Sequence, residues 1–133
     1  MAEFLSVGEI MLRLKTQGHE RFFQSPGFEA TFGGGEANVA VALANYGLNS
    51  GFVSALPDNP IGDACLRELR GFGVDVSQVQ RSGDRMGIYF LEAGANQRPS
   101  NVVYDRANSS IASADPAAFD WPTIFGGAKW MHI

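Results

Sequence analysis

Apolar and polar residues follow one another along the chain in an order typical of an α/β fold. Short apolar runs at residues 4–7 and 52–56 predict buried strands. Apolar positions at helical spacing predict helices at residues 36–46 and 61–72. Because strands that alternate with helices need a sheet that the helices can cover, this order predicts a parallel, Rossmann-like sheet with covering helices.

The helix predicted at residues 36–46 has almost no polar face. From Ala37 to Ala44 every residue except Asn38 is apolar. A helix that is apolar on every side is typical of a buried element, so we expect its neighbours to enclose it. Gly47 is placed to end this helix.

A second type of pattern indicates a small antiparallel sheet. Residues 86–92 and 101–106 alternate between apolar and polar side chains, and so do residues 28–32. Alternation gives a strand one buried and one exposed face, which favours a separate ribbon over another central strand. We therefore expect residues 86–92 and 101–106 to form a two-stranded antiparallel flap.

The last residues predict a short helix and then a strand. Asp115 is placed as an N-cap with Pro116 in the first helical position. An apolar strand begins at Lys129 and continues to Ile133. Since termini usually lie at the surface and not inside a buried strand, we expect a truncated domain.

Composition excludes several classes of protein. The 133 residues, of which 45% are hydrophobic and 18% charged, are typical of a globular domain. A net charge of −4 with scattered Lys and Arg argues against nucleic acid as a partner. No apolar run is long enough for a membrane helix. Cys65 has no disulfide partner, which favours the cytoplasm, and His19 and His132 have no neighbours at metal-ligand spacing.

The glycine run at residues 33–35, before the first predicted helix, is the strongest local motif. A helix N-terminus presents unpaired N–H groups, and glycines let a ligand approach the backbone. A Walker phosphate loop would need Gly-Lys-Ser/Thr, whereas Glu36 follows the glycines here.

Two readings of the glycine run remain besides a plain tight turn. A neutral ligand rich in hydroxyls suits Gly34, Gly35 and Asn38, because an amide both donates and accepts hydrogen bonds. A nicotinamide-binding domain would need Gly or Ala in place of Asn38, although Asp58 lies at a suitable distance for a ribose contact.

The predicted flap carries a second candidate cluster. Tyr104 and Arg106 are two residues apart on one strand and share a face, while Tyr89 can join either face, depending on register. Arginine forms forked, charge-assisted bonds with carboxylates, so the cluster suits an anionic sugar. The alternative is ordinary surface aromatics, with Arg106 paired to Asp105 or Glu92.

Glu9 is a further candidate, since it follows the first strand. Ligands of open α/β sheets bind beyond such strand ends. A plain exposed turn at Glu9 is the alternative.

Taken together, these motifs resemble the ribokinase-like (PfkB) carbohydrate kinases along essentially the whole chain. The segments that carry the resemblance are residues 4–9, 33–44, 47, 58–62 and 73–76. Residues 87–92 and 103–107 are most similar to the 2-keto-3-deoxygluconate kinase branch.

The resemblance implies a parallel α/β core with a β-flap, or lid, that closes over an acidic monosaccharide. The lid strands would come from about residues 10–32 and 86–107. The glycines and the asparagine would hold sugar hydroxyls, the tyrosines would line the flap, and the arginine would clamp the carboxylate. The substrate-binding residues implied are Gly34, Gly35, Asn38, Tyr89, Tyr104, Arg106 and Glu9.

The family transfers the γ-phosphoryl group of MgATP to a sugar hydroxyl, with a late Gly-x-Gly-Asp motif that supplies the base. That motif is absent here. The resemblance therefore implies that residues 1–133 are the amino-terminal, sugar-binding part of a truncated ribokinase-like fold. The ATP-binding part and every catalytic residue would be missing, and the chain alone would be inactive.

Three alternatives to a 2-keto-3-deoxygluconate kinase stay open. The first is a fructokinase or ribokinase of the same family. The second is a non-catalytic sugar-binding module; in either reading the exposed flap strands favour pairing into a homodimer. The third is the nicotinamide-binding domain.

Overall fold

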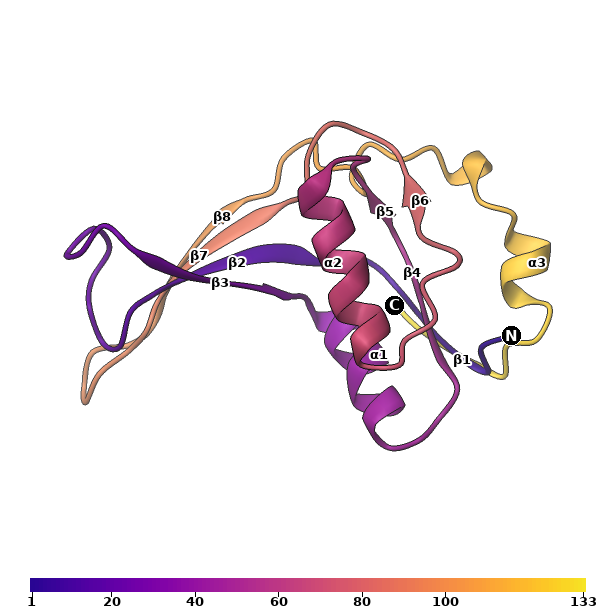
Figure 1. Ribbon diagram of the computed structural model, residues 1–133, viewed down its shortest axis with the longest axis horizontal. Helices are drawn as coiled ribbons and strands as arrows, with labels where there is room; N and C mark the ends of the chain where they lie inside the picture. The colour runs from indigo at the N-terminus through magenta and orange to yellow at the C-terminus, as the bar shows by residue number, and fades with distance from the viewer.

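The chain folds into two regions, which Figure 1 shows as a helix-covered sheet on the right and a long arm on the left. The computed structural model describes residues 1–133. We call the first the α/β region and the second the flap. A sheet of three strands lies in the α/β region, and one of four strands forms the flap.

The sheet of the α/β region is parallel. Strand β1 (Phe4–Val7) lies at its centre, between β4 (Ser50–Val53) and β9 (Trp130–His132), and both neighbours run parallel to it. A second parallel pair continues this edge, β5 (Ala55–Leu56) with β6 (Gln80–Arg81). The predicted α/β class with a parallel sheet is therefore confirmed.

Helices pack on both faces of this sheet. On one face, α1 (Gly35–Asn45) and α2 (Pro60–Gly71) contribute to an apolar cluster that includes Phe52. On the other face, α3 (Trp121–Phe125) contributes to a cluster that includes Val53. Successive residues of a strand point to opposite faces, which places Phe52 and Val53 in different clusters.

Local signals in the sequence set where the helices begin and end. Gly47 and Gly73 follow α1 and α2 with φ of 81° and 87°, the left-handed conformation that glycine adopts without strain. The predicted short helix after Asp115 is confirmed as the 3-10 helix η1 (Pro116–Ala118), and the Asp115 carboxylate accepts a hydrogen bond from the Ala117 N–H.

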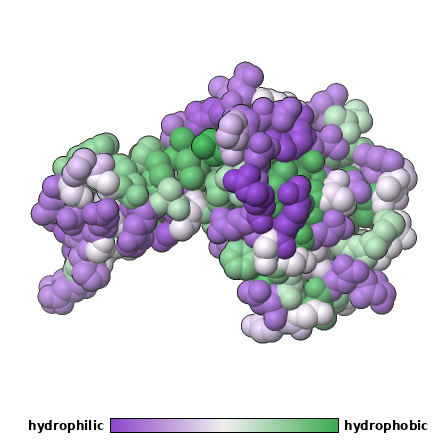
Figure 2. Space-filling model, viewed as in Figure 1, coloured by the Kyte–Doolittle hydropathy of each residue, from purple (hydrophilic) through white to green (hydrophobic).

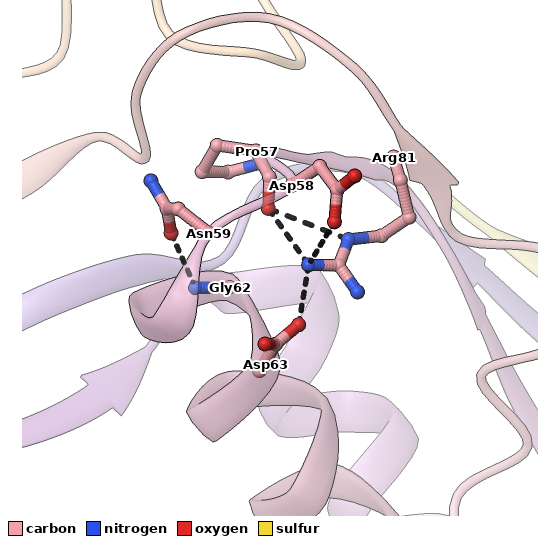
Figure 3. Close-up of polar contacts among 6 residues, drawn as sticks. All are labelled: Pro57, Asp58, Asn59, Gly62, Asp63 and Arg81. Carbon is pink, nitrogen blue, oxygen red and sulfur yellow. Dashed lines mark hydrogen bonds and ion pairs between the residues drawn. The ribbon is translucent and has the colours of Figure 1, made fainter.

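A network around Arg81 holds the turn from β5 into α2 (Figure 3). The guanidinium donates to the Pro57 carbonyl at 3.0 Å and pairs with Asp63 at 2.6 Å. The Asn59 side chain accepts a hydrogen bond from the Gly62 N–H at 2.9 Å and caps α2. A Cβ on Gly62 would collide with the Pro57 carbonyl oxygen, so only glycine fits this turn.

Two expectations about burial are wrong. In α1 only Ala37 and Ala40 are buried, because the helix has the sheet on one side and nothing packed against the opposite side. Strand β9 is not a buried strand either, since it forms the exposed edge of its sheet and leaves Trp130 69% and Met131 50% exposed.

The flap contains four strands in the order β3-β2-β7-β8. They are β2 (Met11–Thr16), β3 (Phe28–Gly33), β7 (Ile88–Glu92) and β8 (Asn101–Asp105). The β7–β8 ribbon is antiparallel as expected, but β7 also pairs with β2 in parallel. The ribbon is therefore not separate: β2 continues outward from the end of β1 and brings the two pairs into one mixed sheet.

The two faces of the flap differ in chemistry, since residues paired across the strands share a face. The tyrosine face carries Arg13, Lys15, Glu29, Thr31, Tyr89, Leu91, Val102 and Tyr104. The phenylalanine face carries Leu12, Leu14, Phe28, Ala30, Phe32, Ile88, Phe90 and Val103. Apolar surface is visible along the arm in Figure 2.

Candidate functional site

The glycine run lies against the residue that follows β1. A Cβ on Gly34 would collide with the carbonyl oxygen of Glu9, so these two backbones are in direct contact. A Cβ on Gly35 would have no neighbour within 4 Å. The first helical residue of α1 therefore faces open space, where a ligand can approach its backbone.

The N-terminus of α1 meets the tyrosine face of the flap at Gly33. A Cβ on Gly33 would lie 3.0 Å from the Tyr89 hydroxyl oxygen and 4.0 Å from Asn38 Oδ1. No side chain caps this helix, and the Gly34 N–H makes only a long, 3.5 Å hydrogen bond to Asn38 Oδ1. The Asn38 amide is exposed, so it can exchange this weak bond for a ligand hydroxyl.

Strand register decides the position of Tyr89, which the sequence left open. Tyr89 is paired directly with Tyr104, so both rings lie on one face, with their centroids 6.0 Å apart. Partial burial raises the pKa of the Tyr89 hydroxyl from its usual value of 10.0, with Arg13 acting in the opposite direction. The hydroxyl is therefore protonated at neutral pH and can donate a hydrogen bond.

Arg106 continues this row of side chains. Its guanidinium carbon lies 5.8 Å from the centre of the Tyr104 ring, and its Nη2 pairs with Glu9 Oε1 at 2.5 Å. The alternative pairings with Asp105 or Glu92 are wrong, since Asp105 pairs with Arg85 at 3.0 Å and Glu92 accepts a hydrogen bond from a backbone N–H. The Arg106 side chain is still 52% exposed, so donors of its fork remain accessible.

Glu9 is a buried carboxylate that both regions share. It is 9% exposed, and its second oxygen accepts a hydrogen bond from Ser109 Oγ at 3.0 Å. Sequence reasoning missed Ser109, because 100 residues separate it from Glu9 and no motif marks it. The exposed-turn alternative for Glu9 is wrong.

The structure brings all the predicted site residues to one place. Contacts lead from Gly34 to Glu9, from Glu9 to Arg106, and from Arg106 through the two tyrosines to Gly33. Asn38 Oδ1 lies on the same side of Gly33 as the Tyr89 hydroxyl, and Gly35 adjoins Gly34. The site offers an open helix N-terminus, an amide, two phenols and one guanidinium. Such groups can hold a small polyhydroxylated anion by hydrogen bonds.

Other candidate chemistry is not supported by the geometry. No three His, Cys, Asp or Glu side chains come close enough together to hold a metal ion. Cys65 is buried, which raises the pKa of its thiol to about 12, with Glu68 adding to the shift, so it is a core residue and not a nucleophile. Asp58, the acid of the nicotinamide alternative, pairs with Arg81 at 3.4 Å. None of the helices is long and apolar enough to cross a membrane.

Comparison with known proteins finds carbohydrate kinases that match most of the chain. The profile of the family described as pfkB family carbohydrate kinase matches residues 1–125. The chain is 38% identical over 115 residues to 2-dehydro-3-deoxygalactonokinase of Haloferax volcanii, which covers 86% of this chain and 36% of the relative. It is 30% identical over 131 residues to 2-dehydro-3-deoxygluconokinase of Bacillus subtilis, over 97% of this chain and 40% of the relative.

A solved structure is also similar throughout. The crystal structure of 2-dehydro-3-deoxygluconokinase from Thermotoga maritima superposes with a TM-score of 0.96 and 53% identity. The match covers 99% of this chain and 40% of that one. The chain thus spans well under half the length of the kinases it matches.

Proposed function

The chain belongs to the pfkB family of carbohydrate kinases, and we propose that its site binds the sugar of a kinase acting on 2-keto-3-deoxygluconate. The reaction proposed for the whole protein moves the γ-phosphoryl group of ATP to the 6-hydroxyl of that sugar. The relatives from Thermotoga and Bacillus are named for the same compound, written 2-dehydro-3-deoxygluconate, and the Haloferax relative for its galacto epimer. Carbohydrate phosphorylation is the activity that all three share.

The observation that carries the choice of an acidic sugar is the position of Arg106. Its half-exposed guanidinium stands beside Tyr104, on the face that also presents Tyr89 to the N-terminus of α1. In this proposal Arg106 binds the sugar carboxylate, and the tyrosines orient the carbon chain. Gly34, Gly35 and Asn38 bind hydroxyls, and Gly34 also keeps the backbone close to Glu9.

We propose that the phosphate donor binds outside these residues. They contain no Gly-Lys-Ser/Thr loop, and no three His, Cys, Asp or Glu side chains come together among them. We therefore assign no residue here to MgATP and no catalytic base, and propose that both belong to the part of the relatives that this chain does not span. The 133 residues alone are expected to show no turnover with ATP and 2-keto-3-deoxygluconate. A cytoplasmic location stays a prediction.

A homodimer through the flap is also part of the proposal. Phe22, Phe23, Phe90 and Val103 line an apolar hollow of about 260 Å³ on the phenylalanine face. Exposed apolar surface of this kind is typical of protein interfaces. The same surface would also be expected of a non-catalytic oligomerisation module. An assay of the whole protein with ATP and sugar distinguishes the two, because such a module would show no turnover.

Arg106→Ala in the complete reading frame tests the substrate. Loss of a charge-assisted hydrogen bond should weaken the binding of 2-keto-3-deoxygluconate by about 1.5–3 kcal/mol, roughly tenfold to a hundredfold in KM. Fructose and ribose serve as neutral controls in the same ATP-coupled assay. A wild-type protein that prefers a neutral sugar, with the variant unaffected, would identify a fructokinase or ribokinase instead.

A further inference from the structure

The tyrosine face of the flap carries one cation that no carboxylate neutralises. Lys15 pairs with Glu29 at 3.4 Å, and Arg106 pairs with Glu9 at 2.5 Å. Arg13 forms no ion pair, and its guanidinium makes one long hydrogen bond of 3.4 Å to a threonine hydroxyl. Its positive charge is therefore the one on this face that remains uncompensated.

Arg13 lies directly beside the candidate site. Strand β2 is the parallel neighbour of β7, and Arg13 is paired with Tyr89 in that register. Neighbouring strands are about 4.8 Å apart, and paired residues share a face. The Tyr89 hydroxyl in turn reaches Gly33 at the N-terminus of α1. The positive charge of Arg13 also lowers the pKa of Tyr89, against the effect of burial, so its field extends to this hydroxyl.

The other charges around the site show why the positive charge of Arg13 is needed. Glu9 offsets the charge of Arg106, and Glu36 lies against Gly8 at the start of α1 without an ion-pair partner. Without Arg13, every cation of the tyrosine face would be paired with a carboxylate, and Glu36 would remain an unpaired negative charge at the start of α1. Such a site would offer an anion no uncompensated positive side chain to attract it at distances where direct contacts do not yet act.

We propose that Arg13 is a specificity-determining residue, whose uncompensated charge makes the site prefer an anionic sugar over a neutral one. Arg106 then supplies the directional bond to the carboxylate, and Arg13 supplies the electrostatic balance that lets the carboxylate enter. This inference rests on the proposed function, because it names a further determinant of the same site.

The test is Arg13→Gln in the complete reading frame, with Lys15→Gln as the matched control. Both changes remove one positive charge from the same face of the same strand, but Lys15 is paired with Leu91 and lies farther from Tyr89 along the flap than Arg13 does. In low salt, Arg13→Gln should raise KM for 2-keto-3-deoxygluconate about tenfold, with the effect in KM and not in kcat. Lys15→Gln should stay within about twofold, and Arg13→Lys should restore most of the affinity.

Salt separates an electrostatic role from a structural one. Because mobile ions screen exposed charges, the tenfold difference should shrink to about threefold or less in 0.5 M NaCl. A KM for Arg13→Gln that equals the wild-type value in low salt would overturn the inference. So would a salt-independent defect, or a control variant that behaves in the same way.

The sugar preference of the wild-type enzyme tests the proposed function separately from the role of Arg13. A wild-type enzyme without preference for the acidic sugar would overturn the proposed function, and this inference with it. If the preference is present, an NMR titration of the Tyr89 ring checks the placement of Arg13. Arg13→Gln should raise the pKa of Tyr89, and Lys15→Gln should leave it in place; an unchanged pKa in Arg13→Gln would contradict the placement.

Discussion

The α/β region and the flap are stabilised by different interactions. Both apolar clusters are centred on the α/β region, where Phe52, Val53 and Cys65 are fully buried. Most side chains in the flap strands are half-buried or exposed, and β8 is exposed along its whole length. The α/β region thus has a packed interior, while the flap relies on strand pairing.

Because of this difference, the two regions contribute different things to the site. The packed region holds Glu9 and the glycine run in place, and the exposed flap supplies Tyr104, which is 60% exposed, and Arg106. A site needs precise backbone contacts on one side and side chains that can reach a ligand on the other. Glu9 and Arg106 form the ion pair that joins the two regions.

The largest expected effect comes from the core. Phe52→Ala should lower the free energy of unfolding by about 3–5 kcal/mol, since it removes a fully buried ring and leaves a cavity. Phe90→Ala, in the flap, should cost less than half as much because that ring is only half-buried. Urea unfolding followed by circular dichroism measures both, and equal losses would show that the flap is as tightly packed as the core.

An intermediate effect on stability is expected at one of the two neighbouring glycines where the regions meet, and almost none at the other. Gly34→Ala should destabilise the fold by about 1–3 kcal/mol, because its Cβ would press on the Glu9 carbonyl. Gly35→Ala should leave the stability unchanged or raise it slightly, since it adds a helix former in open space. Thermal unfolding measures these changes.

The same pair also tests the role of Gly35 in binding. If a sugar approaches its backbone, Gly35→Ala should weaken sugar affinity about tenfold while the fold stays stable. Calorimetric titration with the sugar provides the measurement. Unchanged affinity would restrict the role of the glycine run to the turn.

The smallest effect on stability is expected on the flap surface. Val103→Lys changes the phenylalanine face, and Val102→Lys changes the tyrosine face of the same strand. Both positions are exposed, at 48% and 40%, so each variant should alter stability by about 0.5 kcal/mol or less. Only Val103→Lys should abolish self-association in sedimentation equilibrium. A monomeric wild type, or dissociation by both variants, would contradict pairing through the phenylalanine face.

Local patterns in the sequence were sufficient to predict most elements. The helices expected at residues 36–46 and 61–72 are found at Gly35–Asn45 and Pro60–Gly71. Caps such as Asn59, and glycines with positive φ, act over a few residues, so they can be recognised without knowledge of the fold. The types of residue in the site were recognisable for the same reason, since the motifs are contiguous.

Burial and pairing were decided by the tertiary structure. An apolar pattern states what a helix or strand could bury, but α1 and β9 are exposed where no other element covers them. The face on which Tyr89 lies depended on strand register, and the ion-pair partner of Arg106 is Glu9, which follows β1 and is distant in the sequence. Such contacts join residues that are distant in sequence, and no local preference specifies them.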